Sequence, residues 1–195
     1  MKVVIIKYNA GNIRSVLFAL ERIGVNAIVT DNPLEILSAD RVIFPGVGEA
    51  SSAMNYLREK GLDKLICSLT QPVLGICLGM QLMCAHSEEN NTVCLGIFEQ
   101  KVKLFPTVGF KIPQIGWNNI TDLKSVLFNG IPENAYMYFV HSYYVEKSEN
   151  TIAKTDYVLE FSSAVQKNNF SAVQFHPEKS GEAGQKILEN FIKGF

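Results

Sequence analysis

Cys77 lies in surroundings that suit a nucleophile. An apolar run at residues 72–76 leads into Gly75-Ile76-Cys77-Leu78-Gly79, and a helical pattern follows. A sharp strand-to-helix turn needs glycine on both sides of the nucleophile, because neighbouring backbone comes too close for a Cβ. Such a turn points the sulfur outward at a helix N-terminus, where partial positive charge and free N–H groups favour the thiolate. The alternative is a small buried hydrophobic residue, as most free cysteines are.

A thiolate nucleophile also needs a base, and the chain has three histidines. His86 falls in a polar stretch and is predicted to be solvated on the surface. His141 lies in an aromatic run, where a packed and hydrogen-bonded histidine is expected. His176 follows an expected strand at residues 172–175, so we predict it at a strand end, like Cys77. In parallel sheets, sites form where the strands end.

Glu178 could orient the imidazole of His176. Pro177 separates the two residues, and its fixed φ stiffens the turn so that the carboxylate can be held against the ring. Alternatively, this tripeptide is an ordinary surface turn before a helix. Its occurrence together with Cys77 favours a triad.

Gly46-Val47-Gly48 is a third feature at a predicted strand end. Flexible backbone there could offer an N–H to a developing oxyanion, beside the N–H of Leu78. Alternatively, it is a tight turn between a strand and a helix. The Cys and His residues match none of the usual zinc-ligand spacings, so no metal is predicted.

The first half of the chain has the pattern of a parallel sheet with helices on both faces. Asn12 is a predicted N-cap and Gly24 a predicted helix stop. The expected strands are residues 2–7, 25–30, 41–44 and 72–76, and the expected helices are residues 12–23 and 51–60, with another beginning at Cys77.

The second half is richer in strand patterns, which we interpret as antiparallel additions on the same core. A last helix is expected at residues 182–193. No repeat or linker marks a boundary, so residues 1–195 are predicted to form one α/β domain. The expected additional strands are residues 100–105, 115–121, 136–145 and 172–175.

Composition excludes several classes of protein. The formal net charge of −1 and the lack of a basic run argue against nucleic-acid binding. The apolar stretch near the N-terminus is too short for a signal peptide, and no run approaches membrane-spanning length. The four cysteines form no CxxC pair, so disulfides are not expected. We therefore expect a cytoplasmic protein that binds a small substrate.

Four segments resemble those of the class I (triad) glutamine amidotransferases, and the resemblance covers essentially the whole chain. Met80 before Gln81, where several sister glutaminases carry histidine, indicates the subfamily of histidine biosynthesis, as does Gly11-Asn12-Ile13-Arg14-Ser15-Val16. The four segments are Pro45-Gly46-Val47-Gly48, Gly75-Ile76-Cys77-Leu78-Gly79-Met80-Gln81, Tyr138-Phe139-Val140-His141-Ser142-Tyr143-Tyr144 and Phe175-His176-Pro177-Glu178-Lys179-Ser180-Gly181-Glu182-Ala183-Gly184.

The resemblance implies a flavodoxin-like glutaminase fold, with a mostly parallel central sheet, and a Cys-His-Glu triad without a cofactor. Cys77 would attack the side-chain amide of glutamine to form a thioester. His176, oriented by Glu178, would protonate the departing ammonia and then activate water. The substrate-binding residues implied by the resemblance are Gly46, Val47, Gly48, Leu78, Gln81, Ser142 and Tyr143.

The resemblance also implies a heterodimer in which the partner is a cyclase with a (β/α)₈ barrel, through which ammonia travels to make imidazole glycerol phosphate and AICAR. Asn12, Trp117 and Lys179 match positions that face this partner. For Trp117, a role as a core aromatic residue is an equally open alternative.

Two segments depart from the family pattern. Lys7-Tyr8-Asn9 stands where Asp-Tyr-Gly is more frequent, and Gln114 stands where histidine is common. Both are expected near the partner surface. Two alternatives therefore stay open: a paralogue that supplies ammonia to a sugar amidotransferase for surface glycans, and a non-catalytic scaffold. A cysteine peptidase is less compatible, because no segment suggests a peptide cleft.

Overall fold

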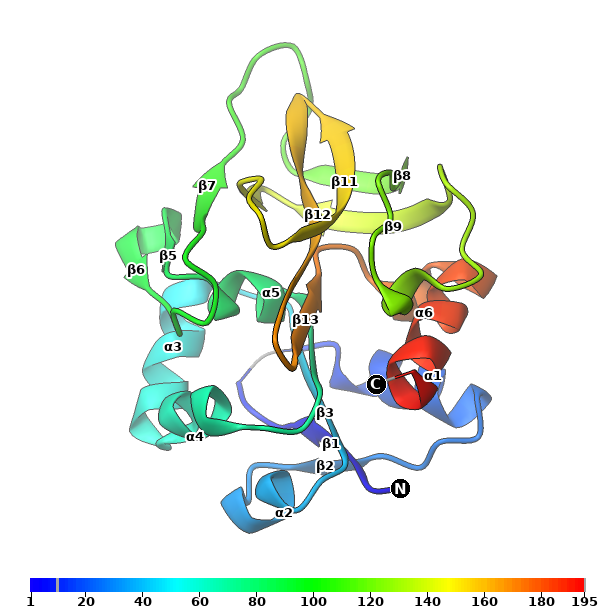
Figure 1. Ribbon diagram of the computed structural model, residues 1–195. Coiled ribbons are helices and arrows are strands. Elements are labelled where there is room, and N and C mark those ends of the chain that lie inside the picture. Colours follow the sequence, from blue (N-terminus) through cyan, green and yellow to red (C-terminus); the bar gives the residue numbers. More distant parts are fainter. Residues whose placement is uncertain (10, 195) are drawn as a thin grey trace.

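An eleven-stranded sheet runs through the part of the chain that the computed structural model describes, residues 1–9 and 11–194 (Figure 1). Its parallel half has the order β2-β1-β3-β4-β13. The parallel strands are β1 (Val3–Ile6), β2 (Ile28–Thr30), β3 (Arg41–Gly46), β4 (Val73–Cys77) and β13 (Phe170–Val173). Because neighbouring parallel strands point the same way, β3, β4 and β13 end at one edge of the sheet.

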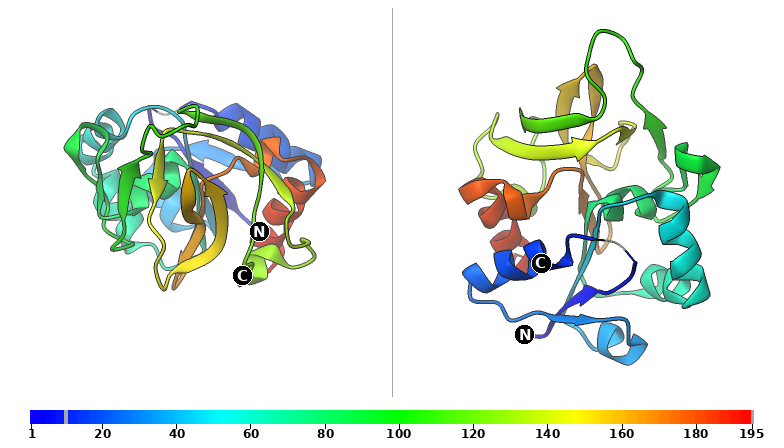
Figure 2. Two further views of the ribbon diagram at one scale, coloured as in Figure 1. Left: turned by 90° about the horizontal axis from the view of Figure 1, so that it is seen from above. Right: turned by 180° about the vertical axis from the view of Figure 1, so that it is seen from behind.

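Helices cover both faces of the parallel half, as Figure 2 shows from behind. The alternation within β1 explains why: Val3 and Ile5 belong to one buried cluster, and Val4 and Ile6 to the other. α1 (Ile13–Arg22) and α6 (Gly181–Lys193) pack on the first cluster. α3 (Ala50–Glu59), α4 (Leu62–Ser68) and α5 (Leu78–Met83) pack on the second, with the short helix α2 (Pro33–Leu37).

The rest of the main sheet is mostly antiparallel and continues from β13 in the order β12-β10-β7-β5-β6. β11 pairs with β12, and β8 and β9 form a separate two-stranded sheet. The remaining strands are β5 (His86–Ser87), β6 (Thr92–Val93), β7 (Lys101–Leu104), β8 (Gln114–Asn119), β9 (Tyr136–His141), β10 (Tyr143–Val145), β11 (Thr151–Tyr157) and β12 (Leu159–Lys167). The 3₁₀ turns are η1 (Glu89–Asn91), η2 (Val126–Phe128) and η3 (Pro177–Lys179).

Several predictions about the second half were wrong. The strand expected at residues 172–175 is β13, and it joins the sheet parallel to β4 rather than as an antiparallel addition. The strand expected at residues 136–145 is two strands in different sheets, β9 and β10, separated at Ser142. The β11–β12 hairpin was not predicted. Strand pairing is a long-range property, and local alternation does not determine it.

The N-cap role predicted for Asn12 is also only partly observed. It precedes α1 as expected, but its side chain makes no capping bond, and its φ of 71° is left-handed. Asparagine tolerates this conformation better than most residues. Its carboxamide therefore remains available for contacts elsewhere.

No helix within the described residues is long and apolar enough to cross a membrane.

Candidate active site

Cys77 forms the predicted sharp turn between β4 and α5. Its φ of 53° and ψ of −109° are rare for a residue with a side chain, and such backbone strain is concentrated at functional sites. The flanking glycines are required sterically. A Cβ on Gly79 would lie 1.9 Å from the carbonyl oxygen of Phe44, and one on Gly75 would lie 2.9 Å from Sδ of Met83. The turn thus depends on both glycines.

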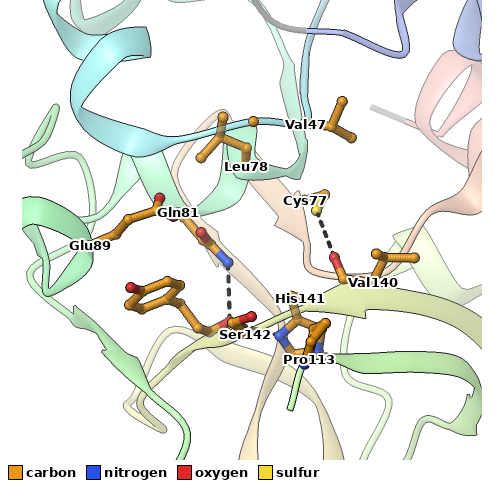
Figure 3. Close-up of a pocket in the computed structure, with 11 residues that line it drawn as sticks. Val47, Cys77, Leu78, Gln81, Glu89, Pro113, Val140, His141 and Ser142 are labelled. Carbon is orange, nitrogen blue, oxygen red and sulfur yellow. Dashed lines mark hydrogen bonds between the residues drawn. The ribbon is translucent and has the colours of Figure 1, made fainter.

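The sulfur of Cys77 is held among polar groups although the residue is only 5% exposed. The thiol can donate to the carbonyl oxygen of Val140, with Sγ 3.8 Å from that atom (Figure 3). Nε2 of Gln174 donates to the sulfur over 3.7 Å. Buried Cys84 and Cys94 also contact carbonyl oxygens, over 3.5 and 3.6 Å, so the donor from Gln174 is what distinguishes Cys77.

His176 and Glu178 lie at the start of η3, directly after β13. Nδ1 of His176 is 2.7 Å from Oε1 of Glu178, and both side chains are almost completely buried. The backbone around them is fixed, because the N–H of His176 donates to Tyr138 and Ser180 donates to the carbonyl of His176. Since Glu178 occupies Nδ1, Nε2 is the ring nitrogen left for the thiol of Cys77.

The side chain of Cys77 is close enough to His176 to influence its protonation. Burial disfavours the charged imidazole, but hydrogen bonds to Cys77 and Glu178, together with their charges, outweigh it and raise the pKa of His176 to about 10. The structure therefore brings the three predicted triad residues together, with the carboxylate at Nδ1 of the ring.

Asn12 is a fourth member of this cluster. Its Nδ2 donates to Oε1 of Glu178 and lies 3.4 Å from Nδ1 of His176. The left-handed turn before α1 thus directs its side chain to the triad carboxylate. Sequence reasoning assigned Asn12 to a helix N-cap and to the partner surface but not to the triad, because nothing local links residue 12 to residue 178.

We expect the free energy of unfolding to be greatest near pH 6.5, because two buried imidazoles titrate on opposite sides of that value. Burial lowers the pKa of His141 to about 4, so between pH 6.5 and 4 the unfolded chain binds a proton that folded His141 does not, and stability falls. The raised pKa of His176 affects the free energy of unfolding above pH 6.5. Its contribution is complete below pH 6.5 and is lost as the pH rises toward 10.

On each side of pH 6.5, the free energy of unfolding changes by at most about 1.4 kcal/mol per pH unit. Urea unfolding between pH 4 and pH 10 measures both slopes. Below about pH 8, where the buried thiols of Cys84 and Cys94 do not yet ionise on unfolding, the variant His176→Asn should lose the alkaline decline and keep the acidic one. An unchanged alkaline decline in this variant would contradict our assignment of the effect to His176.

A pocket of about 290 Å³ opens beside Cys77 (Figure 3). Among the residues predicted to bind substrate, Gly46 ends β3 just outside its lining. The others that were predicted line it directly: Val47, Gly48, Leu78, Gln81, Ser142 and Tyr143. Their convergence follows from the fold, because β3, β4 and the break between β9 and β10 meet at this edge of the sheet.

The predicted oxyanion segment contains a backbone conformation that favours glycine. Gly48 has a φ of 128°, and the carbonyl of Val47 accepts a hydrogen bond from Gly11 over 3.3 Å. Because a trans peptide sets its C=O and N–H on opposite sides, the N–H of Gly48 points away from Gly11. Leu78 begins α5, so its N–H has no partner within the helix and is suited to an oxyanion.

Glu89 is a pocket residue that sequence reasoning missed. It lies in η1 and lines the pocket opposite Cys77 (Figure 3). Its carboxylate accepts from the N–H of Ala50 over 2.7 Å, and burial raises its pKa. In the polar run around it, only His86 was interpreted, as a solvated surface residue. His86 in that run is instead half-buried in β5, with Nε2 2.9 Å from Asn91.

One of the two departures from the family pattern is not at the surface, where it was expected. Gln114 is 4% exposed and contacts His141, with Oε1 3.0 Å from Nε2 of the imidazole. It therefore lies beneath the pocket and not on the partner surface, because alternation along β8 turns it inward. In the other departure, Lys7 and Asn9 are exposed, and only Tyr8, which the family pattern shares, is buried, with its hydroxyl donating to the carbonyl of Pro45 over 2.6 Å. His141, as predicted, is buried and hydrogen-bonded.

Trp117 is not a core residue, since it is 55% exposed on β8. Its ring packs edge-on against Tyr138, with the ring centroids 5.9 Å apart. The ammonium of Lys179 lies 5.9 Å from the centre of the same tyrosine ring. These three side chains form an exposed cluster next to η3. Within residues 1–9 and 11–194, no group of acidic, histidine or cysteine side chains is arranged to hold a metal ion.

Comparisons with known proteins identify the family. The family model described as Glutamine amidotransferase class-I matches residues 4–195. Imidazole glycerol phosphate synthase subunit HisH of Bacteroides fragilis (strain YCH46) is 58% identical over 195 residues, covering 99% of this chain and 100% of that protein. The subunit of the same name from Haemophilus influenzae (strain ATCC 51907 / DSM 11121 / KW20 / Rd) is 46% identical over 194 residues, covering 99% of this chain and 98% of its own.

Solved structures support the fold. A putative GMP synthase protein from Thermoplasma acidophilum aligns with a TM-score of 0.74 at 20% identity, covering 98% of this chain and 92% of its own. PurLQS from Thermotoga maritima aligns with a TM-score of 0.75 at 16% identity, covering 99% and 98%. The predicted flavodoxin-like α/β fold is confirmed.

Proposed function

The chain belongs to the class I glutamine amidotransferase family, and from this premise we propose that it is the glutaminase subunit of imidazole glycerol phosphate synthase. It hydrolyses glutamine to glutamate and ammonia, which a cyclase subunit uses to make imidazole glycerol phosphate and AICAR in histidine biosynthesis. The observation that carries the proposal is the convergence of Cys77, His176 and Glu178 at the pocket.

Acylation follows from the positions of these groups. The thiolate of Cys77 attacks the side-chain carbonyl carbon of glutamine, and the N–H groups of Leu78 and Gly48 are the proposed donors to the oxyanion. When the C–N bond breaks, Nε2 of protonated His176 gives its proton to the nitrogen, which leaves as ammonia. Glu178 stabilises the imidazolium until this proton is transferred, because it accepts from Nδ1.

Hydrolysis of the thioester reverses the proton flow. Water gives a proton to Nε2 of His176 while its oxygen attacks the thioester carbon. The C–S bond then breaks, and glutamate leaves with Cys77 again a thiolate. The same imidazole thus acts first as an acid and then as a base.

The far side of the pocket suits the amino-acid end of glutamine. We assign this end to Gln81 and to the backbone of Ser142 and Tyr143, which line the pocket away from the sulfur. Glu89 adds a carboxylate in the same region, which suits the α-ammonium group.

The exposed cluster of Trp117, Tyr138 and Lys179 suits the cyclase surface. Aromatic residues flanked by a cation are typical of interface centres. Lys179 follows Glu178 directly, and Asn12 bonds to that carboxylate, so contacts made here adjoin the triad. We propose that the (β/α)₈ barrel docks over this face and receives ammonia through a channel. One cytoplasmic domain of residues 1–195 is the proposed unit.

The two alternatives have less support. A non-catalytic scaffold does not require the buried imidazole and carboxylate to face the thiol. If the partner were a sugar amidotransferase, the similarity to the histidine-pathway subunits over the full chain at 46–58% identity would be unexplained.

The proposal is tested by measuring glutamine hydrolysis with and without the purified cyclase and its nucleotide substrate. We expect slow turnover alone and stimulation of about 10-fold or more in the complex, since allosteric coupling is typically 1–3 kcal/mol. The variant Trp117→Ala should weaken stimulation. Leu34→Ala, on exposed α2 at the opposite end of the molecule (Figure 1), is the control and should not. Undiminished hydrolysis without any response to the cyclase would contradict the assigned partner.

A further inference from the structure

Gln174 is a completely buried carboxamide that neither the triad nor the substrate contacts above include. It lies between β13 and His176 and is 0% exposed. A buried amide is costly unless its hydrogen bonds are satisfied. Its Oε1 accepts from Nε2 of Gln81 over 3.0 Å, and its Nε2 donates to Sγ of Cys77 over 3.7 Å. The side chain therefore bridges the nucleophile and a pocket residue.

The direction of this bridge is determined by a backbone carbonyl. Nε2 of Gln81 also lies 3.1 Å from the carbonyl oxygen of Tyr143, which can only accept. The NH₂ group of Gln81 must therefore face Tyr143, and its second hydrogen points to Oε1 of Gln174. It follows that the NH₂ group of Gln174 faces the sulfur, although oxygen and nitrogen in an amide are otherwise easily exchanged.

The sulfur of Cys77 therefore has two partners with opposite preferences. The carbonyl of Val140 can only accept, so it favours the thiol form. The NH₂ group of Gln174 can only donate, so it favours the thiolate. A hydrogen bond to a charged acceptor in a buried site is stronger than one to a neutral acceptor. Gln174 thus promotes the nucleophilic form.

The same bridge orients Gln81. Both hydrogens of its NH₂ group are directed to Tyr143 and Gln174, so Oε1 is the atom that Gln81 can present to the pocket that it lines (Figure 3). An amide oxygen accepts hydrogen bonds, which suits an ammonium group and not a carboxylate. If Gln174 were lost, the amide of Gln81 could rotate and present the wrong group.

We propose that Gln174 is a further catalytic residue, which stabilises the thiolate of Cys77 and fixes the amide of Gln81 as an acceptor for substrate. This inference rests on the proposed glutaminase function and deepens it. It links two events that the triad alone does not connect, formation of the nucleophile and recognition of the amino-acid end of glutamine.

The test is the variant Gln174→Met, which keeps the length of the side chain and removes both hydrogen bonds. Ser171→Ala is the matched control, because Ser171 is on β13, is equally buried and has no partner for its hydroxyl. Both are made in a Cys67→Ser background, since exposed Cys67 would also react with alkylating agents.

The first readout is the rate at which iodoacetamide alkylates Cys77 between pH 5 and 10, followed on its peptide by mass spectrometry. At pH 7 we expect Gln174→Met to react about tenfold more slowly than the control, as expected for a lost charge-assisted hydrogen bond. At the alkaline end the rates should converge, because the thiolate then forms in both proteins. If the substitution only loosened the structure, the alkylation rate would change at every pH. Profiles that coincide with the control would overturn the proposal.

The second readout is the KM for glutamine in the complex with the cyclase, which should rise about tenfold in Gln174→Met. If this variant does not fold, NMR of the unaltered protein tests the proposal through the side-chain amide signals of Gln174. They should shift with the same pH midpoint as the alkylation of Cys77, and constant signals would refute the contact. Alkylation needs no turnover, so failure of the glutaminase assignment would appear separately, as absent hydrolysis in the control.

Discussion

Replacing Cys77 with alanine will reduce glutamine hydrolysis by about 10⁴-fold or more, while the protein stays folded. Removing the nucleophile of a triad leaves only binding and oxyanion stabilisation, which do not form the covalent intermediate. Alanine is smaller than cysteine and fits the β4–α5 turn, since the sterically critical positions are the glycines. Hydrolysis is measured as glutamate released by the complex with the cyclase.

Two controls separate chemistry from structure. Cys67→Ala removes an exposed thiol far from the triad and should leave hydrolysis unchanged. The complex containing Cys77→Ala, supplied with ammonium salt instead of glutamine, should still form the cyclase product. Glutamate release by Cys77→Ala at more than a few per cent of the normal rate would show that another group performs the attack.

Replacing Gly79 with alanine will destabilise the fold by about 3 kcal/mol or more. Helix propensity alone predicts the opposite sign, because alanine in a helix is about 1 kcal/mol better than glycine. The added Cβ would, however, lie 1.9 Å from the carbonyl oxygen of Phe44 in β3, so the strand and helix must separate. Such a loss is a large part of the roughly 5–15 kcal/mol that stabilises a typical domain.

Urea unfolding measures the effect of Gly79→Ala, with Gly96→Ala as the control. A Cβ on Gly96 would meet nothing within 4 Å, but its φ of +70° makes alanine strained there. The control should therefore cost only about 1 kcal/mol. Equal losses in the two variants would mean that close packing against Phe44 does not constrain the turn at Cys77.

Local sequence was sufficient for the main elements of the site. The glycines around Cys77 indicated a sharp turn, and His176-Pro177-Glu178 indicated an oriented imidazole, because each signal lies within a few residues of the chain. The alternation of strand and helix patterns likewise predicted β1, β2, β3 and β4 of the parallel half, but not that β13 joins them. Such features depend on backbone sterics and short-range periodicity, which a sequence displays directly.

Tertiary structure decided the partners of these groups. Asn12 reaches Glu178 across 166 positions of sequence, and Gln174 reaches Cys77 across 97. Neither contact has a local signature. Glu89 had no predicted role and Gln114 was expected near the partner surface, yet the first lines the pocket and the second lies beneath it.

The physical reason is the difference between local and non-local determinants. Turn geometry, capping and amphipathic faces follow from neighbouring residues, so the sequence by itself determined the nucleophile turn, the imidazole–carboxylate pair and the α/β class. The pairing of β13 with β4, the orientation of the Gln81 and Gln174 amides, and the raised pKa of His176 arise from segments that meet only after the sheet has formed. Burial and hydrogen-bond satisfaction in the folded core therefore decided them.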